Sequence, residues 1–135
     1  MKIVLDTNVL ISALLSPSGP PAQILNLVIE GKVKLIIDNR IYLEYSNVLH
    51  RKKFNFKQES INPLLDFIRM ESETIMAEPL NIEFNDEDDL VFYEVAKSGN
   101  ALYIVTGNTK HFPNEKMIIT PSEFLKIYLS QKDQK

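Results

Sequence analysis

The chain has 135 residues, 44% of them hydrophobic and none of them cysteine, and its formal net charge at pH 7 is −3. This length predicts a single globular domain over residues 1–135, and the lack of cysteine excludes disulfide bonds and thiolate metal sites. The negative charge gives no general attraction to nucleic acid, so binding one would require a local basic patch or bound cations. Because no apolar run approaches membrane-spanning length and no signal-peptide pattern is present, we expect a cytoplasmic protein with no membrane partner.

Short apolar segments alternate with helical patterns along the first half of the chain. The predicted elements are, in order, a strand over residues 3–5, helices over 9–15 and 22–30, a strand over 34–38, and helices over 39–53 and 63–72. Gly31 is expected to end the second helix in a left-handed conformation, Asn39 to open the third, and Pro63 to lie in the first turn of the fourth. Each of the two strands leads into an aspartate.

The second half continues this alternation. It contains a predicted strand over residues 74–77, a helix over 86–97, strands over 102–106 and 117–120, and a helix that begins at residue 121. Gly99 is expected to end the first of these helices, and Thr120 to cap the second. Helices that alternate with short, wholly apolar strands predict the α/β class, with a central parallel sheet between helical layers.

Polar residues follow two of the predicted strands. Asp6 comes directly after residues 3–5, and Thr106 and Asn108 lie at the end of the strand that begins at residue 102. An ionised carboxylate at the end of a buried strand is costly without a compensating partner. Open parallel sheets bind ligands at the carboxyl ends of their strands, beside the point where strand order reverses, so the two clusters predict one shared crevice.

Two further acids fall on the apolar faces of predicted helices. Glu44 lies three residues after Ile41 and four before Val48, and therefore points toward the core. Asp89 lies three residues before Phe92, again on an apolar face, in the first turn of its helix. The sequence thus predicts that both carboxylates face inward.

Inward carboxylates at one edge of a sheet repel one another unless cations or protons offset their charge. Oxygen ligands without histidine or cysteine suit Mg²⁺ or Mn²⁺ rather than Zn²⁺, so the hypothesis is a divalent metal held by Asp6, Glu44 and Asp89. The alternative is that each acid only caps a helix or bonds locally. For Asp86 and Asp88, in the first turn of their helix, capping is at least as good an interpretation.

The chain resembles the PIN domain, a metal-dependent ribonuclease fold found in many toxin–antitoxin systems, in VLDTNVLIS, DEDDLVFYEVA, IVTGNTKHFP and IITP, and in Glu44. The resemblance runs nearly end to end and implies a three-layer α/β/α fold with a central parallel sheet. The metal-site acids that it implies are Asp6, Glu44 and Asp89, with Asp86 and Asp88 as auxiliaries, and the supporting residues are Thr7, Asn8, Ser12 and Thr106. Asn108 departs from the pattern, because many PIN domains have an aspartate there, and this puts tight binding of a second metal in doubt.

Hydrolysis of RNA phosphodiester bonds is the chemistry that the resemblance implies. A divalent metal acidifies water and neutralises charge on the phosphoryl oxygens. With no cysteine, and with His50 and His111 interpreted as surface residues, no covalent intermediate is expected. The resemblance also implies the toxin of a type II toxin–antitoxin system, with a small antitoxin protein and a second copy of the chain as candidate partners.

A basic segment is the candidate RNA-binding surface. In HRKKFNFK, residues 50–57, four cations alternate with two phenylalanines, a pattern that can pair with phosphates and stack on unpaired bases. The cations are Arg51, Lys52, Lys53 and Lys57, and Lys110 adds a further one beside Asn108. The alternative is that the cations interact with the negative end of the preceding helix dipole while the phenylalanines pack in the core.

Three other functions share part of this pattern. Phosphatases of the haloacid-dehalogenase type also use a strand-end aspartate, but they place a second aspartate where this chain has Asn8. Receiver domains need an acidic pair near the first strand and a lysine at the end of the last, which this chain lacks. A non-catalytic PIN-like domain that binds RNA or protein through a weakened metal site is the remaining alternative.

Overall fold

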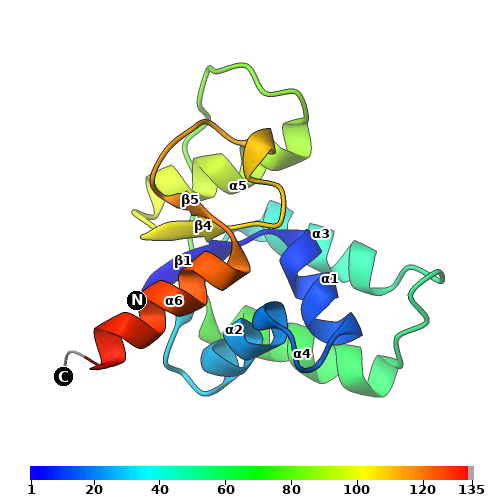
Figure 1. Ribbon diagram of the computed structural model, residues 1–135. Coiled ribbons are helices and arrows are strands. Elements are labelled where there is room, and N and C mark those ends of the chain that lie inside the picture. Colours follow the sequence, from blue (N-terminus) through cyan, green and yellow to red (C-terminus); the bar gives the residue numbers. More distant parts are fainter. Residues whose placement is uncertain (134–135) are drawn as a thin grey trace.

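Five short strands form one parallel sheet in the computed structural model, which describes residues 1–133 (Figure 1). The strands are β1 (Lys2–Leu5), β2 (Lys34–Ile37), β3 (Glu73–Thr74), β4 (Tyr103–Val105) and β5 (Ile118–Ile119). Their order across the sheet is β3-β2-β1-β4-β5, and every neighbouring pair is parallel. The chain therefore starts at the centre, builds outward to β3 and returns to the other side at β4, so strand order reverses beside β1.

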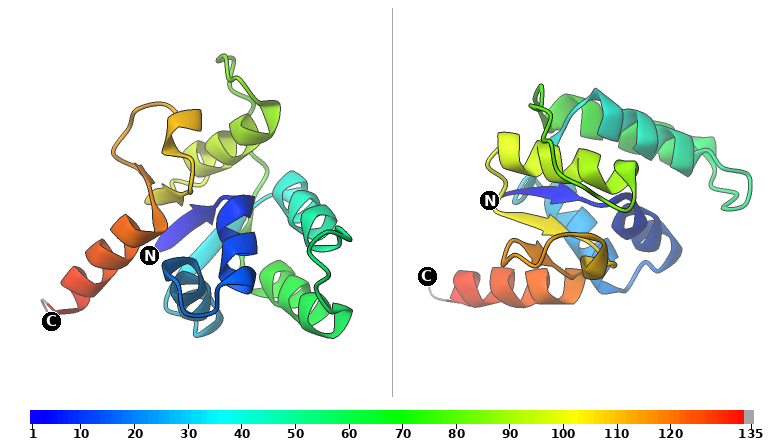
Figure 2. Two further views of the ribbon diagram at one scale, coloured as in Figure 1. Left: turned by 45° about the vertical axis from the view of Figure 1, so that its right-hand side comes forward. Right: turned by 90° about the horizontal axis from the view of Figure 1, so that it is seen from above.

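Six α-helices surround this sheet within residues 1–133. They are α1 (Thr7–Leu15), α2 (Pro20–Ile29), α3 (Asn39–Leu49), α4 (Gln58–Glu71), α5 (Glu87–Ser98) and α6 (Pro121–Asp133). Figure 2 shows α5 on one face of the sheet, α1, α2 and α6 on the opposite face, and the α3–α4 hairpin beside β2. The predicted three-layer α/β/α fold is confirmed. In this part of the chain, no helix combines the length and apolar character needed to cross a bilayer.

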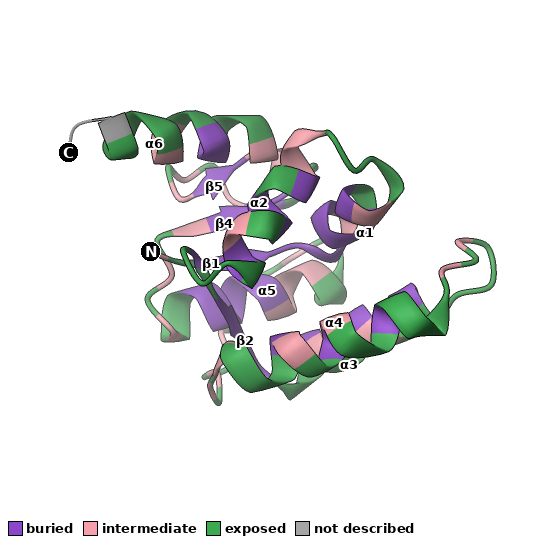
Figure 3. Cartoon of the chain, turned by 90° about the horizontal axis from the view of Figure 1, so that it is seen from below, coloured by how far each residue is buried: buried purple, intermediate pink, exposed green. Residues whose placement is uncertain are grey.

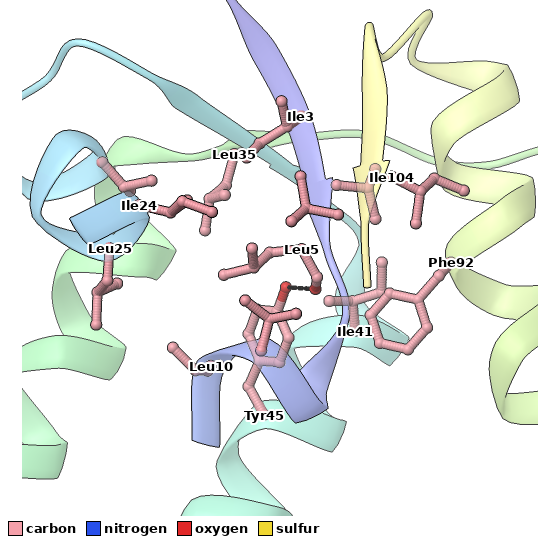
Figure 4. Close-up of a cluster of buried hydrophobic side chains, with 14 of the residues drawn as sticks. Ile3, Leu5, Leu10, Ile24, Leu25, Leu35, Ile41, Tyr45, Phe92 and Ile104 are labelled. Atoms are coloured by element: carbon pink, nitrogen blue, oxygen red, sulfur yellow. Dashed lines mark hydrogen bonds between the residues drawn. The ribbon is translucent and has the colours of Figure 1, made fainter. Parts of the chain in front are cut away.

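The core lies on both sides of β1. In β1 and β2 an exposed lysine precedes three buried apolar residues, as expected for strands covered on both faces. Ile3 and Leu5 pack with Leu35 of β2, Ile104 of β4 and Phe92 of α5 (Figure 4). Figure 3 shows that buried residues follow the strands and the inward faces of the helices. Burial on both sides holds the end of β1, and hence the first residue after it, in a defined place.

Tyr45 of α3 links that helix to the same strand end. Its side chain is fully buried, and its hydroxyl donates a hydrogen bond to the carbonyl oxygen of Leu5 (Figure 4). A buried tyrosine hydroxyl needs such a partner to offset the loss of water. The bond therefore aligns α3 with the carboxyl end of β1.

Several predicted helix boundaries were wrong. The fourth helix begins at Gln58, not at Pro63, which lies inside it. Proline lacks an N–H group, so it costs one internal hydrogen bond there, and burial of Ile61 and Leu65 on the inner face offsets that cost. The third helix ends at Leu49 rather than at residue 53, and a tight turn follows it, with Asn55 at a positive φ of 51°.

Two predicted strand ends also shift. Asp38, not Asn39, caps α3, because its Oδ1 accepts a hydrogen bond of 2.9 Å from the N–H of Ile41; β2 therefore stops at Ile37. The strand predicted over residues 74–77 is only Glu73–Thr74, and Met76 beyond it is 95% exposed. The left-handed Gly31 is confirmed, with φ of 78°.

The cap predicted for the last helix is confirmed. The Glu123 N–H donates to the hydroxyl of Thr120 at 3.2 Å, and the Thr120 N–H donates to the Glu123 carboxylate at 2.9 Å. Such a reciprocal pair satisfies two N–H groups at a helix start.

Candidate active site

A cavity of about 440 Å³ opens at the carboxyl end of β1, where strand order reverses. Its walls come from the end of β1, the first turns of α1, the middle of α3, the start of α5 and the turn that follows α3. The carboxylates that border it are Asp6, Glu44, Asp86, Asp88 and Asp89. The structure thus gathers all five acids predicted from the sequence around one space.

Asp6 is buried at the junction of β1 and α1, with 7% of its surface exposed. It occupies the N-cap position of α1, yet its side chain makes no capping hydrogen bond. Its Oδ2 instead accepts a hydrogen bond of 2.7 Å from the hydroxyl of Thr106, at the end of β4. The two strand-end clusters therefore lie side by side, and the simple capping interpretation of Asp6 is wrong.

Glu44 reaches from α3 toward the first turn of α1. Its Oε2 accepts a hydrogen bond from the Thr7 hydroxyl, and its side chain is half-buried. Asn8, the next residue of α1, lines the cavity, and its Oδ1 accepts a hydrogen bond of 3.3 Å from the N–H of Gly107. These bonds tie α1 to α3 and to the loop after β4, and so fix the walls of the cavity.

The remaining acids come from the start of α5. Asp86 is the N-cap, and its Oδ1 accepts a hydrogen bond of 2.9 Å from the N–H of Asp88, so the capping interpretation holds for Asp86. No such bond involves the side chain of Asp88 in the part of the chain described. Asp89 is largely buried, and its Oδ2 lies 3.5 Å from Nδ1 of His111.

Burial and mutual repulsion disfavour the ionised forms of three of these acids. The pKa of Asp6 is raised, first by loss of solvent and then by the charge of Glu44, although hydrogen bonds from the Thr106 hydroxyl and from the backbone N–H of Thr7 oppose the shift. The pKa of Glu44 is raised by burial and by the acids of α5. Burial, Asp6 and Asp86 together raise the pKa of Asp89 from 3.8 to about 6.

The acids border the cavity but do not converge on one point. Across residues 1–133, no three Asp, Glu or His side chains approach closely enough to hold a single metal ion. Asp6 is turned toward Thr106 and Glu44 toward Thr7, so each carboxylate has its own hydroxyl partner. Metal binding by these residues stays a prediction.

The other predicted site residues divide into two groups. Ser12 and Arg51 line the cavity. Asn108 does not: its side chain is exposed, and its N–H donates to the Thr106 hydroxyl at 3.0 Å. The remaining cations lie outside the cavity lining, and they are Lys52, Lys53, Lys57 and Lys110.

Sequence reasoning missed two features around the cavity. His111, interpreted as a surface residue, is exposed, but its Nδ1 lies 3.5 Å from Oδ2 of Asp89, an acid that borders the cavity. Arg40 joins the buried carboxylates of Asp38 and Glu94 through contacts of 2.8 and 2.9 Å. Glu94 also accepts a hydrogen bond of 2.8 Å from the N–H of Leu80. The only sequence signal was the charge of Glu94 within an apolar helix.

The raised pKa of Asp89 predicts a pH dependence of stability in EDTA. Because its folded pKa of about 6 exceeds the ordinary 3.8, ionisation favours the unfolded chain, and stability is lost as the pH rises from about 4 to about 6. After solvent screening the loss is on the order of 1 kcal/mol. Urea unfolding across this range should show a larger loss in the wild type and in Asp66→Asn, an exposed acid outside the cavity, than in Asp89→Asn, where only the raised pKa values of Asp6 and Glu44 remain. If the unfolding free energies of the wild type and of Asp89→Asn changed equally with pH, the raised pKa of Asp89 would be contradicted.

Two comparisons show which known sequences this chain is similar to. A family model described as PIN domain matches residues 2–110. An uncharacterized protein of Methanocaldococcus jannaschii is 34% identical over 111 residues, which cover 80% of this chain and 71% of that protein.

Proposed function

Because this chain belongs to the PIN domain family, whose members are generally nucleases, we propose that it is a divalent-metal-dependent endoribonuclease that hydrolyses RNA phosphodiester bonds. The observation that carries the proposal is the cavity at the strand-order reversal, bordered by five carboxylates from three separate segments of the chain. So many acids around one space are costly unless a cation neutralises them.

The donor chemistry of this cavity fits Mg²⁺ or Mn²⁺. All five acids offer hard oxygen ligands, and the pKa values of Asp6, Glu44 and Asp89 are raised first by burial and then by repulsion from neighbouring acids, which a cation would offset. Mg²⁺ keeps several waters and uses only one or two protein carboxylates directly, so it does not require three of them to meet at one point. Asp6, Glu44 and Asp89 would hold the metal, with Asp86 and Asp88 as auxiliaries.

A bound divalent cation would acidify water and stabilise charge on the phosphoryl oxygens. The chain supplies positioning and proton transfer. Thr106 and Thr7 orient Asp6 and Glu44 through their hydroxyl groups. One of the carboxylates that border the cavity would accept the proton of the attacking water.

We extend the proposal to a biological role. The family resemblance supports the toxin of a type II toxin–antitoxin system, working in the cytoplasm, with a small antitoxin protein that covers the cavity and with self-association into a homodimer. Expression of the wild type, but not of a cavity variant, should then be harmful to a host cell.

A non-catalytic role is the second candidate. The observation that favours it is the absence, in residues 1–133, of three acids placed to hold one ion, together with an amide at Asn108. Such a domain would bind RNA or a protein partner without cutting it. RNA that is bound but stays intact in Mg²⁺ and in Mn²⁺ would support this role.

Metal binding should stabilise the fold measurably. At about 100 times its dissociation constant, Mn²⁺ should add about 2.7 kcal/mol to the unfolding free energy and raise the melting temperature by on the order of 10 °C. Asp6→Asn should lose most of this shift, because it removes the most buried carboxylate of the cavity.

Asp66→Asn is the matched control for this titration, since Asp66 is an exposed acid of α4 outside the cavity. It should keep the full shift in calorimetry. A wild-type melting temperature that does not respond to Mn²⁺ or Mg²⁺ would count against the metal site.

A further inference from the structure

The cavity has one basic residue in its lining within residues 1–133. Arg51 borders it in the turn that follows α3. No carboxylate in this part of the chain lies within ion-pair distance of its guanidinium, whereas Arg40 is held by two. Arginine presents five donors in a fixed fork that matches phosphate oxygens. An unpaired guanidinium beside an acidic cavity is therefore available to a phosphate group.

Phe54 borders the same cavity from the same turn. Phe54 lies three residues after Arg51. Its N–H donates a hydrogen bond of 3.2 Å to the carbonyl oxygen of Arg51, so both residues belong to one backbone turn. The Phe54 ring is half-buried and stacks on Phe56, with centroids 5.5 Å apart and ring planes 12° from parallel. This turn projects from the end of the α3–α4 hairpin (Figures 1 and 3).

The aromatic pair is suited to accept a nucleic acid base. Lys53 places its Nζ 5.0 Å from the centre of the Phe54 ring, as an exposed side chain at the molecular surface. An exposed cation–π contact of this kind is weaker than the stacking of a base on an aromatic ring. A base can therefore displace Lys53 from Phe54.

We propose that Arg51 and Phe54 form a substrate subsite, in which Arg51 contacts a phosphate and Phe54 stacks on an unpaired base next to the bond that is cut. This inference rests on the proposed function and deepens it by naming two residues that would contact a single-stranded RNA substrate. A paired base cannot leave its stack to meet Phe54 without the cost of unpairing. Duplex RNA should therefore bind without help from Phe54.

Binding of a short fluorescein-labelled single-stranded RNA, followed by anisotropy in Mg²⁺ at several salt concentrations, tests the subsite. The Asp6→Asn background keeps the RNA intact. Phe54→Leu should weaken binding roughly tenfold without changing the salt slope, and Phe54→Trp should restore it. Arg51→Gln should weaken binding and lower the salt slope by about 0.7. Binding of the corresponding duplex should not change with Phe54→Leu.

Two control variants repeat the same substitutions at positions outside the cavity lining. These variants, Phe67→Leu and Arg69→Gln, should bind RNA like the parent. The subsite is overturned if Phe54→Leu binds like Phe67→Leu, if Arg51→Gln binds like Arg69→Gln, or if duplex and single strand bind equally well. Failure of the Asp6→Asn parent to bind single-stranded RNA overturns it too. Cleavage plays no part in this measurement, so a protein that binds in this way but does not cut RNA would contradict the nuclease and leave the subsite standing.

Discussion

Asp6→Asn should lower the rate of RNA cleavage by roughly 10²–10³-fold or more, which is the largest catalytic effect expected of a single substitution in this chain. Asp6 is the most buried acid of the cavity and the one fixed by the Thr106 hydroxyl. A neighbouring carboxylate is therefore least able to move into its position and take over its role. The amide keeps the shape of the side chain and can still accept the bond from Thr106, but it cannot supply a negative charge.

The same substitution should leave the metal-free fold intact. Burial and Glu44 raise the pKa of Asp6, so a neutral side chain is favoured at that position in the absence of metal. The melting temperature in EDTA should therefore stay the same or rise. Full cleavage activity in Asp6→Asn, measured against Asp66→Asn with the same RNA, would remove Asp6 from the mechanism.

Arg40→Met should destabilise the protein by about 3 kcal/mol and lower its melting temperature by on the order of 10 °C. The side chains of Asp38 and Glu94 are only 8% and 6% exposed, and Arg40 is the cation that contacts both. Removing it leaves two buried carboxylates without a positive partner. Because Arg40 joins α3 to α5, which carry Glu44 and Asp89, the rate of cleavage should fall as well.

Arg69→Met is the control for this experiment. Arg69 lies 4.7 Å from the ring of Tyr42 and is exposed, so its loss should cost less than about 1 kcal/mol. Urea unfolding of both variants gives the comparison directly. Equal stabilities for Arg40→Met and Arg69→Met would show that Glu94 and Asp38 tolerate burial without their cation.

The sequence located the edge of the sheet where the acids gather because local patterns determine it. A short, wholly apolar strand that leads into Asp6 identifies the carboxyl end of a buried strand. The spacing of Glu44 from Ile41 and Val48 gave its inward direction, because a regular helix fixes which residues share a face. Both signals lie within a few residues of the acid itself.

Other features depend on contacts that no local pattern records. Arg40 and Glu94 are 54 positions apart, and each alone resembles an ordinary surface charge. Pro63 was interpreted as the start of a helix because proline is favoured there, whereas packing of Ile61 and Leu65 against the core extends α4 past it. The contact between His111 and Asp89 likewise depends on how the loop after β4 returns toward α5.

Cleavage of a fluorescent single-stranded RNA pool by the wild type, in Mg²⁺, in Mn²⁺ and in EDTA, tests the central claim most directly. Asp6→Asn purified in parallel reports any contaminating nuclease, and DNA of the same sequences tests the choice of RNA. The proposed function predicts RNA cleavage by the wild type with either metal and none in EDTA. RNA that stays intact under every condition, from a protein that melts at the same temperature with and without metal, would contradict it.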